Sequence, residues 1–370
     1  MLVYLLGAQV VVRSFAGLFL SIVHSRQEMR LDTKAESIGR FSGVGLGLCA
    51  LAAGLGLAGV IWGLLLGEIL RLAYLYGVTR RHFTFRKNET SCRSVRSIVI
   101  SALPFGFFSL MMSLNYKGDS VILSFFHGQT VVGTYYAAYH LVLVGLVLPT
   151  VVGGALYPSF SSSAAAEHRD KLNFPLSAAF RLMLLMGAAG SIVVYAWADQ
   201  IVQLLYTRAY VDSGPCLKIL AWSMVFMFPQ YVLGAAMLAV GRERTQLAIW
   251  IVAVGLNMVF NLLFIPRFGA IAASVVTVCT ECLLVVLFYA VMESEVNERI
   301  AGTQLWRLIA PLVLSFAGSS ALAHFSVSMF FGIPLVGVIL LGSVVAFQTF
   351  SAEEVLRYKR LLSMERRTLL

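Results

Sequence analysis

Residues 247–292 read LAIWIVAVGLNMVFNLLFIPRFGAIAASVVTVCTECLLVVLFYAVM. Two apolar runs, 247–265 and 270–292, flank a short interruption that contains Arg267 and Gly269. Each run has roughly the 20 residues that a helix needs to cross the hydrocarbon core of a membrane. The runs are continuously apolar, whereas the strands of a membrane barrel alternate apolar and polar residues. The stretch therefore predicts two membrane-spanning helices joined by a short loop.

Nine further apolar segments of this kind occur along the 370 residues. They lie at 2–23, 38–57, 59–79, 97–116, 131–153, 176–197, 215–240, 305–324 and 330–350, and the fourth can extend through Val121–Phe126. The chain is 59% hydrophobic and 12% charged, with a mean hydropathy of +0.84. A soluble chain of this length needs far more polar surface to cover its core. We therefore predict an all-α, polytopic membrane protein with about 11 transmembrane helices.

The basic residues indicate how these helices are oriented. If the loop after the first helix is cytoplasmic, the cytoplasmic segments hold 20 Lys and Arg residues and the opposite side holds 3, namely Lys117, Arg208 and Arg267. Such an imbalance is what the positive-inside rule predicts for a correct topology. We therefore expect a multi-pass protein of the cell (inner) membrane with its N-terminus outside and its C-terminus in the cytoplasm. The net charge of +10 is explained in this way without a nucleic-acid partner.

An internal repeat indicates the domain organisation. Gly56, Glu68 and Tyr76 recur 213 residues later as Gly269, Glu281 and Tyr289, and the same offset aligns the first two predicted helices with the seventh and eighth. Parallel repeats of this kind are common in transporters. We expect two pseudo-repeated helical lobes, of which the first is incomplete because it lacks its opening three helices, and we infer a truncated chain. The expected domains are 1–80 (partial N-terminal lobe of three helices), 81–96 (basic cytoplasmic linker), 97–292 (C-terminal lobe of six helices), 305–350 (extra helix pair) and 351–370 (basic amphipathic cytoplasmic tail).

Several short motifs occur in a specific order. They are Pro104, Asp119, Gly133–Tyr135, Tyr157-Pro158, Tyr206, Gly241-Arg242, Asn257, Asn261 and IPRFGAIAAS at 265–274. Together they resemble the polysaccharide transporters, or O-antigen-type flippases, of the multidrug/oligosaccharidyl-lipid/polysaccharide exporter superfamily. The resemblance covers nearly the whole chain. It implies two lobes of six helices, often with two extra helices, and this chain would be that arrangement without the first three.

The resemblance implies a flippase that moves lipid-linked oligosaccharides of the undecaprenyl-pyrophosphate type across a bacterial inner membrane, for polysaccharide or lipopolysaccharide biosynthesis. Membrane lipids, a polysaccharide polymerase and glycosyltransferases are the partners that it suggests. Two alternatives stay open. One is a multidrug/cation antiporter of the same superfamily, which would prefer an acidic cavity. The other is an inactive truncated membrane protein.

Ionisable residues inside predicted spans are candidate functional residues, because each costs about 2.5–3.5 kcal/mol at the centre of a membrane helix. Arg13 lies in the middle of the first span, where its planar guanidinium could bind pyrophosphate oxygens or pair with an acid. Lys117 and Asp119 are two residues apart and should point in different directions, whereas Asn115 and Asp119 should share a helix face. We predict that these four residues line the substrate path, with an anchor at the external membrane interface as the alternative for Lys117 and Asp119.

Three further residues are candidates for ion coupling. Glu68 and Arg71 are spaced i, i+3, which favours a local structural ion pair over proton coupling. Glu281 occupies the repeat position of Glu68, but Leu284 stands where an arginine would pair with it. Its partner must therefore come from another helix, or its carboxyl must be protonated, and either state suits ion coupling.

Aromatic residues and missing motifs complete the predictions. Tyr135, Tyr136, Tyr139 and His140 cluster early in the fifth span, which is typical of an interfacial aromatic belt, with sugar stacking as the alternative. The sequence has no phosphate-binding G-x-x-x-x-G-K-[ST] motif, no metal-ligand spacing and no arrangement for acyl transfer. We therefore expect no catalytic residue, no metal and no cofactor, and a transporter rather than an enzyme. Transport would be driven by an ion gradient or by the gradient of the substrate.

Overall fold

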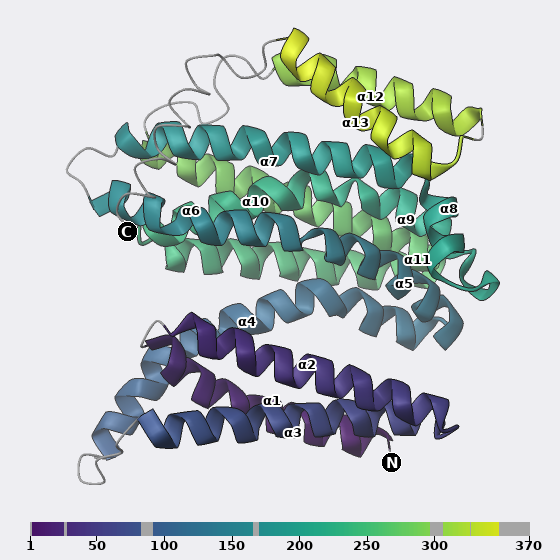
Figure 1. Cartoon of the computed structure of the whole chain (residues 1–370). Helices are drawn as coiled ribbons and strands as arrows, with labels where there is room; N and C mark the ends of the chain where they lie inside the picture. The colour runs from purple at the N-terminus through teal and green to yellow at the C-terminus, as the bar shows by residue number, and fades with distance from the viewer. Residues whose placement is uncertain are drawn as a thin grey trace. The chain divides into compact units, whose positions relative to one another are not determined.

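The computed structural model describes residues 2–25, 28–82, 92–165, 170–296, 306–325 and 327–347. All regular elements within these ranges are helices (Figure 1). They are α1 (Leu2–Ser25), α2 (Met29–Ala52), α3 (Gly56–His82), α4 (Cys92–Phe126), α5 (Gln129–Gly145), α6 (Val147–Ala165), α7 (Asp170–Ala196), α8 (Ala198–Leu205), the 3-10 turn η1 (Arg208–Tyr210), α9 (Ser213–Ala221), α10 (Ser223–Ala239), α11 (Glu243–Val296), α12 (Trp306–His324) and α13 (Met329–Ala346).

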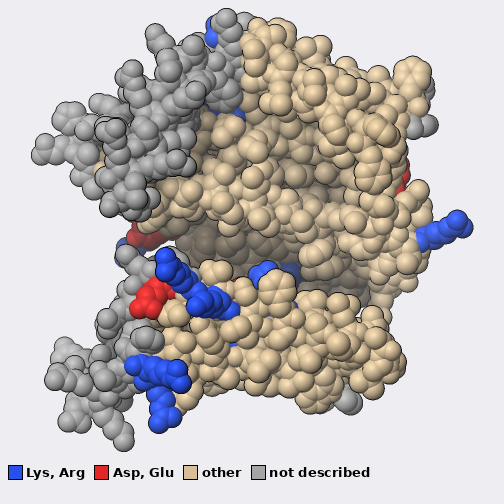
Figure 2. Space-filling model, in the orientation of Figure 1, with Lys and Arg blue, Asp and Glu red and all other residues tan. Residues whose placement is uncertain are grey.

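Several of these helices are suited to cross a membrane. Among the described residues, six are long and apolar enough by length and composition, and the bent pair α9–α10 raises this number to seven. Uncharged residues cover most of the described surface on the face drawn in Figure 2. The prediction of an all-α polytopic membrane protein is therefore confirmed.

Helix α11 covers 54 residues, but it is a hairpin of two helices. Its backbone leaves the helical conformation at Gly269, where φ is 56° and ψ is −135°. Asn257 Nδ2 donates a hydrogen bond to Thr280 Oγ1 at 2.9 Å, although a straight helix would separate these residues by about 35 Å. The chain therefore reverses at Gly269, a residue that adopts positive φ without steric cost. The two runs predicted at 247–265 and 270–292 are the two arms of this hairpin.

The remaining predicted segments also coincide with helices, with one clear displacement. The second segment was expected at 38–57, but α2 begins at Met29 and ends at Ala52. The charged stretch that includes Arg30, Asp32 and Lys34 continues the helix, which hydropathy alone does not detect. The fourth segment does extend through Phe126. Residues 83–91 of the expected linker and the tail at 351–370 lie outside the described residues.

The chain divides into two compact units, Met1–Ser97 and Ile98–Leu370. In the first unit, glycines at intervals of four residues bring α2 and α3 into backbone contact. A Cβ atom at Gly67 would lie 2.5 Å from the Gly39 carbonyl oxygen and 2.6 Å from Gly43 Cα, and one at Gly63 would lie 2.4 Å from the Gly47 nitrogen. Small residues at such spacing allow helices to associate closely in a membrane, where burial of apolar surface supplies little driving force.

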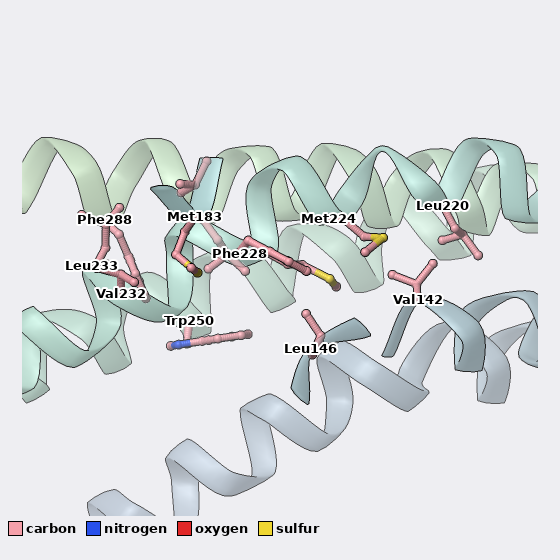
Figure 3. Packing of buried hydrophobic residues seen from close by; sticks show 14 of the residues in the cluster. Val142, Leu146, Met183, Leu220, Met224, Phe228, Val232, Leu233, Trp250 and Phe288 are labelled. Atoms are coloured by element: carbon pink, nitrogen blue, oxygen red, sulfur yellow. The ribbon is translucent and has the colours of Figure 1, made fainter. Parts of the chain in front are cut away.

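The second unit is built around one large apolar core. Buried side chains of α5, α7, α9, α10 and both arms of α11 form it, and Figure 3 shows part of this packing around Phe228 and Met224 of α10. Helices α12 and α13 pack against each other and against α7. Trp197 fixes this pair, because its indole contacts Gly332 and its Nε1 donates to the Val327 carbonyl oxygen at 3.0 Å.

The α2–α3 contact yields a first prediction. Gly67→Ala should lower the free energy of unfolding by about 1–3 kcal/mol, because the added methyl group overlaps the backbone of α2. Gly45→Ala is the matched control, since a Cβ there meets no atom within 4 Å. Thermal unfolding of the purified variants in detergent measures the difference. Equal melting temperatures for the two variants would contradict the observed backbone contact.

Candidate functional site

A ladder of buried polar side chains joins α4 to the second arm of α11. Asn115 and Asp119 lie four residues apart on α4, and Thr277 and Glu281 lie four residues apart on α11. Residues at this spacing share a helix face, and all four are buried. Asn115 pairs with Glu281 and Asp119 pairs with Thr277, so the two helices run antiparallel where they meet. The fold thus brings together residues more than 150 positions apart.

Asp119 is the most completely partnered residue of the ladder. Its Oδ2 accepts a hydrogen bond from the Tyr135 hydroxyl of α5, and Thr277 Oγ1 lies 3.2 Å from the same oxygen. Its Oδ1 accepts the backbone N–H of Ser120 at 2.7 Å. A buried carboxyl group is stabilised only when donors replace the water that it loses. These three donors allow Asp119 to lie fully buried in the unit.

Glu281 is only half satisfied. Its Oε1 accepts a hydrogen bond from Asn115 Nδ2 at 2.9 Å. Its Oε2 is buried and has no hydrogen-bond partner among the described residues. A buried polar atom without a partner costs about 1–3 kcal/mol, and more if it is charged. The open oxygen is therefore the place in the ladder where a proton or a cation would be most stabilising.

The first arm of α11 adds amides to the ladder. Asn261 Nδ2 donates to Asn257 Oδ1 at 2.8 Å, and Asn257 Nδ2 donates to Thr280 Oγ1. Asn261 Oδ1 has no partner among the described residues. We call Asn115, Asp119, Tyr135, Asn257, Asn261, Thr277, Thr280 and Glu281 the polar ladder. Its oxygen atoms come from α4, α5 and both arms of the α11 hairpin, so the turn at Gly269 is required for its assembly.

The first unit holds a separate group of charges. Arg71 contacts Glu68 at 3.4 Å, as the i, i+3 spacing predicts. It makes a shorter contact of 2.8 Å with Glu36 of α2, and Glu36 also pairs with Arg40 at 2.6 Å. Arg71 is buried and Glu68 is partly buried. Four residues thus form an ion-pair network that includes the predicted local pair of Glu68 and Arg71.

The structure places the seven predicted residues in three groups. Asn115, Asp119 and Glu281 lie in the polar ladder of the second unit. Glu68 and Arg71 lie in the ion-pair network of the first unit. Arg13 and Lys117 are exposed on α1 and α4, and Lys117 points away from Asp119, as the spacing of two predicts. The functional roles of all seven stay predictions.

Several residues of these networks were missed or misread in the sequence. The interpretation of Tyr135 and Tyr139 as interfacial is wrong, because both side chains are fully buried. Thr277 and Glu36 carried no signal of their own, since a hydroxyl within a predicted helix, or an acid just before one, is ordinary. The useful signal for Thr277 was its position four residues before Glu281, on the helix face that needs a partner.

The fold and the polar ladder together define a class. Helices long enough to cross a membrane enclose ionisable groups, and such groups mark transport pathways in membrane proteins. The protein is therefore of the multi-pass membrane transporter class. Residues 2–345 match the family model of the lipid II flippase MurJ, and the chain belongs to this family. The predicted membership of a flippase family for lipid-linked sugars is confirmed.

Curated relatives are similar over parts of their length. The probable low-salt glycan biosynthesis flippase Agl15 of Haloferax volcanii is 22% identical over 345 residues, which are 88% of this chain and 70% of Agl15. The capsular polysaccharide biosynthesis protein CapF of Staphylococcus aureus is 18% identical over 194 residues, 52% of this chain and 49% of CapF. The probable flippase AglR of Haloferax volcanii is 23% identical over 243 residues, 64% of this chain and 49% of AglR. The chain thus spans about half the length of CapF and AglR.

The ladder yields a second prediction. Tyr135→Phe should lower the free energy of unfolding by about 1–3 kcal/mol, because it removes a donor from the buried Asp119 carboxyl group while keeping the ring. Tyr136→Phe is the control, since Tyr136 is exposed and its hydroxyl makes no hydrogen bond among the described residues. Thermal unfolding in detergent distinguishes the two. A Tyr135→Phe protein as stable as the Tyr136→Phe protein would show that the bond to Asp119 does not stabilise the fold.

Proposed function

We propose that this chain moves lipid-linked glycans across a membrane for the biosynthesis of a polysaccharide or another cell-surface glycan. The observation that carries the proposal is the match to the lipid II flippase MurJ family over residues 2–345. The names of Agl15 and CapF, which refer to glycan and capsular polysaccharide biosynthesis, support the same substrate class. The chain acts as a transporter and not as an enzyme.

The polar ladder is the proposed site of ion coupling. Glu281 has a buried oxygen without a partner among the described residues, while Asp119, one helical turn away along the ladder, is held by three donors. An ion or proton that binds Glu281 would change the hydrogen bond to Asn115 and hence the contact between α4 and α11. Protonation of a buried carboxyl group strongly changes the energy of its hydrogen bonds, because solvent does not screen the charge. Arg13, an exposed cation on α1 of the first unit, is a proposed contact of the pyrophosphate linker. Lys117, an exposed cation on α4 of the second unit, is separately a proposed residue of the substrate path.

The lobe organisation supports alternating access. Adding 213 to the bounds of α1, α2 and α3 gives 215–238, 242–265 and 269–295. These ranges nearly coincide with the bent pair α9–α10 and with the two arms of α11. Gly56 and Gly269, which correspond by this offset, both have positive φ. We propose that α1–α3 and the last three spans of the second lobe are related repeats, and that transport proceeds by movement of one lobe against the other.

The proposed setting is the cytoplasmic (inner) membrane, with the N-terminus outside and the C-terminus inside. The distribution of Lys and Arg supports this orientation. The proposed substrate carrier is a polyprenyl pyrophosphate of the undecaprenyl type. Glycosyltransferases that make the lipid-linked glycan and a polymerase that uses it are the proposed partners.

Translocation is tested on the full chain in proteoliposomes. We expect a fluorescent lipid-linked oligosaccharide to move between leaflets, and Glu281→Gln and Asp119→Asn to reduce the initial rate about tenfold, because coupling free energies are of this size. Asp212→Asn is the control, since Asp212 is exposed and lies outside the ladder. Leaflet exchange is read from quenching by a membrane-impermeant reagent. No translocation by the unsubstituted chain would contradict the proposed function.

The orientation is tested by labelling single cysteines. In a background without the five natural cysteines, Ala209→Cys should react with an impermeant maleimide from the outside of cells, because the proposed orientation has η1 on the external side. Arg244→Cys at the start of α11 should react only after the membrane is permeabilised. Both positions are exposed in the structure, so a lack of reaction reports sidedness. The reverse pattern would invert the proposed topology.

A further inference from the structure

The second unit contains a cavity that is separate from the hydrogen bonds of the polar ladder. It has a volume of about 320 Å³ and is lined by residues of α4, α6, α10 and α11. Six of its lining residues are aromatic, including Tyr116, Tyr231, Trp250 and Phe288. Figure 3 labels Trp250 and Phe288 among the core residues, and the two rings are in edge-to-face contact. The volume is at the lower end of the range for small-ligand sites, about 300–1,000 Å³.

Three buried polar atoms at this cavity have no hydrogen-bond partner among the described residues. They are Gln230 Nε2, Gln246 Oε1 and Trp250 Nε1. Each of these side chains is at least nine-tenths buried, with exposures of 3%, 5% and 4%. Leaving such atoms unpaired is costly, and native proteins rarely place three around one space without a partner for them. The cavity therefore offers two donors and one acceptor to an occupant.

The lining excludes several classes of ligand. Among the described residues that line the cavity there is no Lys, Arg or His to bind a phosphate, and no Asp or Glu to bind a cationic drug. A purely apolar chain such as an isoprenoid would leave the three polar atoms unsatisfied. Water alone would satisfy them but would gain nothing from the aromatic faces. An uncharged ring with hydroxyl groups on its edge and C–H groups on its face fits both features.

Contacts within the fold hold the aromatic side chains of the cavity in place. Trp250 packs edge-to-face against Phe108 at 6.1 Å and against Phe288 at 6.5 Å between ring centroids. The Tyr116 and Tyr231 hydroxyls lie 3.3 Å apart and hold α4 to α10 at the cavity. Aromatic side chains held in this way keep their faces available without loss of conformational entropy on binding. The site is thus organised before a ligand arrives.

We propose that this cavity binds one sugar ring of the lipid-linked glycan. The proposal rests on the proposed function for the substrate class, and it assigns a subsite for the sugar within the second unit. Gln246 and Leu238 flank the turn between α10 and α11, which the charge distribution places on the cytoplasmic side. The cavity therefore takes the sugar on the side where a glycosyltransferase would deliver it. Tyr116, which lines the cavity, follows Asn115 of the polar ladder directly in α4.

The experiment measures binding, not transport. The full chain in nanodiscs is titrated with radiolabelled farnesyl pyrophosphate that carries one N-acetylglucosamine, and separately with farnesyl pyrophosphate. We expect the sugar-bearing probe to bind about tenfold more tightly, which corresponds to one or two net hydrogen bonds. Equal affinities for the two probes would overturn the proposal.

Two variants and a control locate the effect. Trp250→Phe removes the indole N–H, and Gly154→Leu fills the cavity from α6, where a Cβ at Gly154 meets no atom within 4 Å. Both should abolish the preference for the sugar-bearing probe. Gly255→Leu is the matched control, because Gly255 is also a helical glycine with open space around its Cβ position and does not line the cavity. An unchanged preference in Trp250→Phe and Gly154→Leu would overturn the assignment to this cavity.

The outcomes separate this proposal from the proposed function. The sugar preference can be present and depend on the cavity while the chain fails to translocate glycans in proteoliposomes. This result would contradict the proposed function and support the sugar site. Translocation without a sugar preference would support the proposed function and contradict the sugar site.

Discussion

The polar ladder between α4 and α11 is the interaction on which the second unit depends. Asp119 and Glu281 are carboxyl groups buried between helices, and such groups are stable only if protein donors replace water. Asn115, Tyr135 and Thr277 supply these donors. To bring Thr277 and Glu281 to α4 while Asn257 approaches from the other side, α11 must fold back, and Gly269 provides the reversal. One electrostatic requirement thus determines the arrangement of three helical spans.

The same requirement gives the unit a point at which it can switch. Asp119 has its full set of donors, whereas Glu281 has an open oxygen. The Asp119–Thr277 pair is therefore the stable part of the ladder and the Asn115–Glu281 pair the less stable part. Binding of a proton or cation at Glu281 alters the Asn115 contact. Tyr116, which lines the aromatic cavity, is the next residue in α4 after Asn115. In our account, the sugar and the ion act on the same segment of α4, which is how two ligands become thermodynamically coupled.

Much of this fold is predictable from the sequence, because hydrophobic length is a strong signal for a spanning helix. The two arms of α11 and the i, i+4 relation of Asn115 and Asp119 follow from local spacing alone. The start of α2 does not, since its charged first turns carry no hydropathy signal, and the ion pair of Glu36 with Arg71 of α3 joins residues 35 positions apart. The partners of Glu281 and the burial of Tyr135 depend on contacts between residues 142 to 166 positions apart. No local pattern encodes those contacts, and Tyr135 and Tyr139 of α5 were accordingly misread as interfacial.

The most direct test of the account is the charge that moves when substrate binds. Proteoliposomes that contain the full chain are adsorbed on a solid-supported membrane, and a lipid-linked oligosaccharide is added under an imposed ion gradient. The account predicts a substrate-evoked current in the unsubstituted protein that is lost in Glu281→Gln and retained in Asp212→Asn. A current of equal size in Glu281→Gln would contradict the claim that the polar ladder couples glycan movement to an ion.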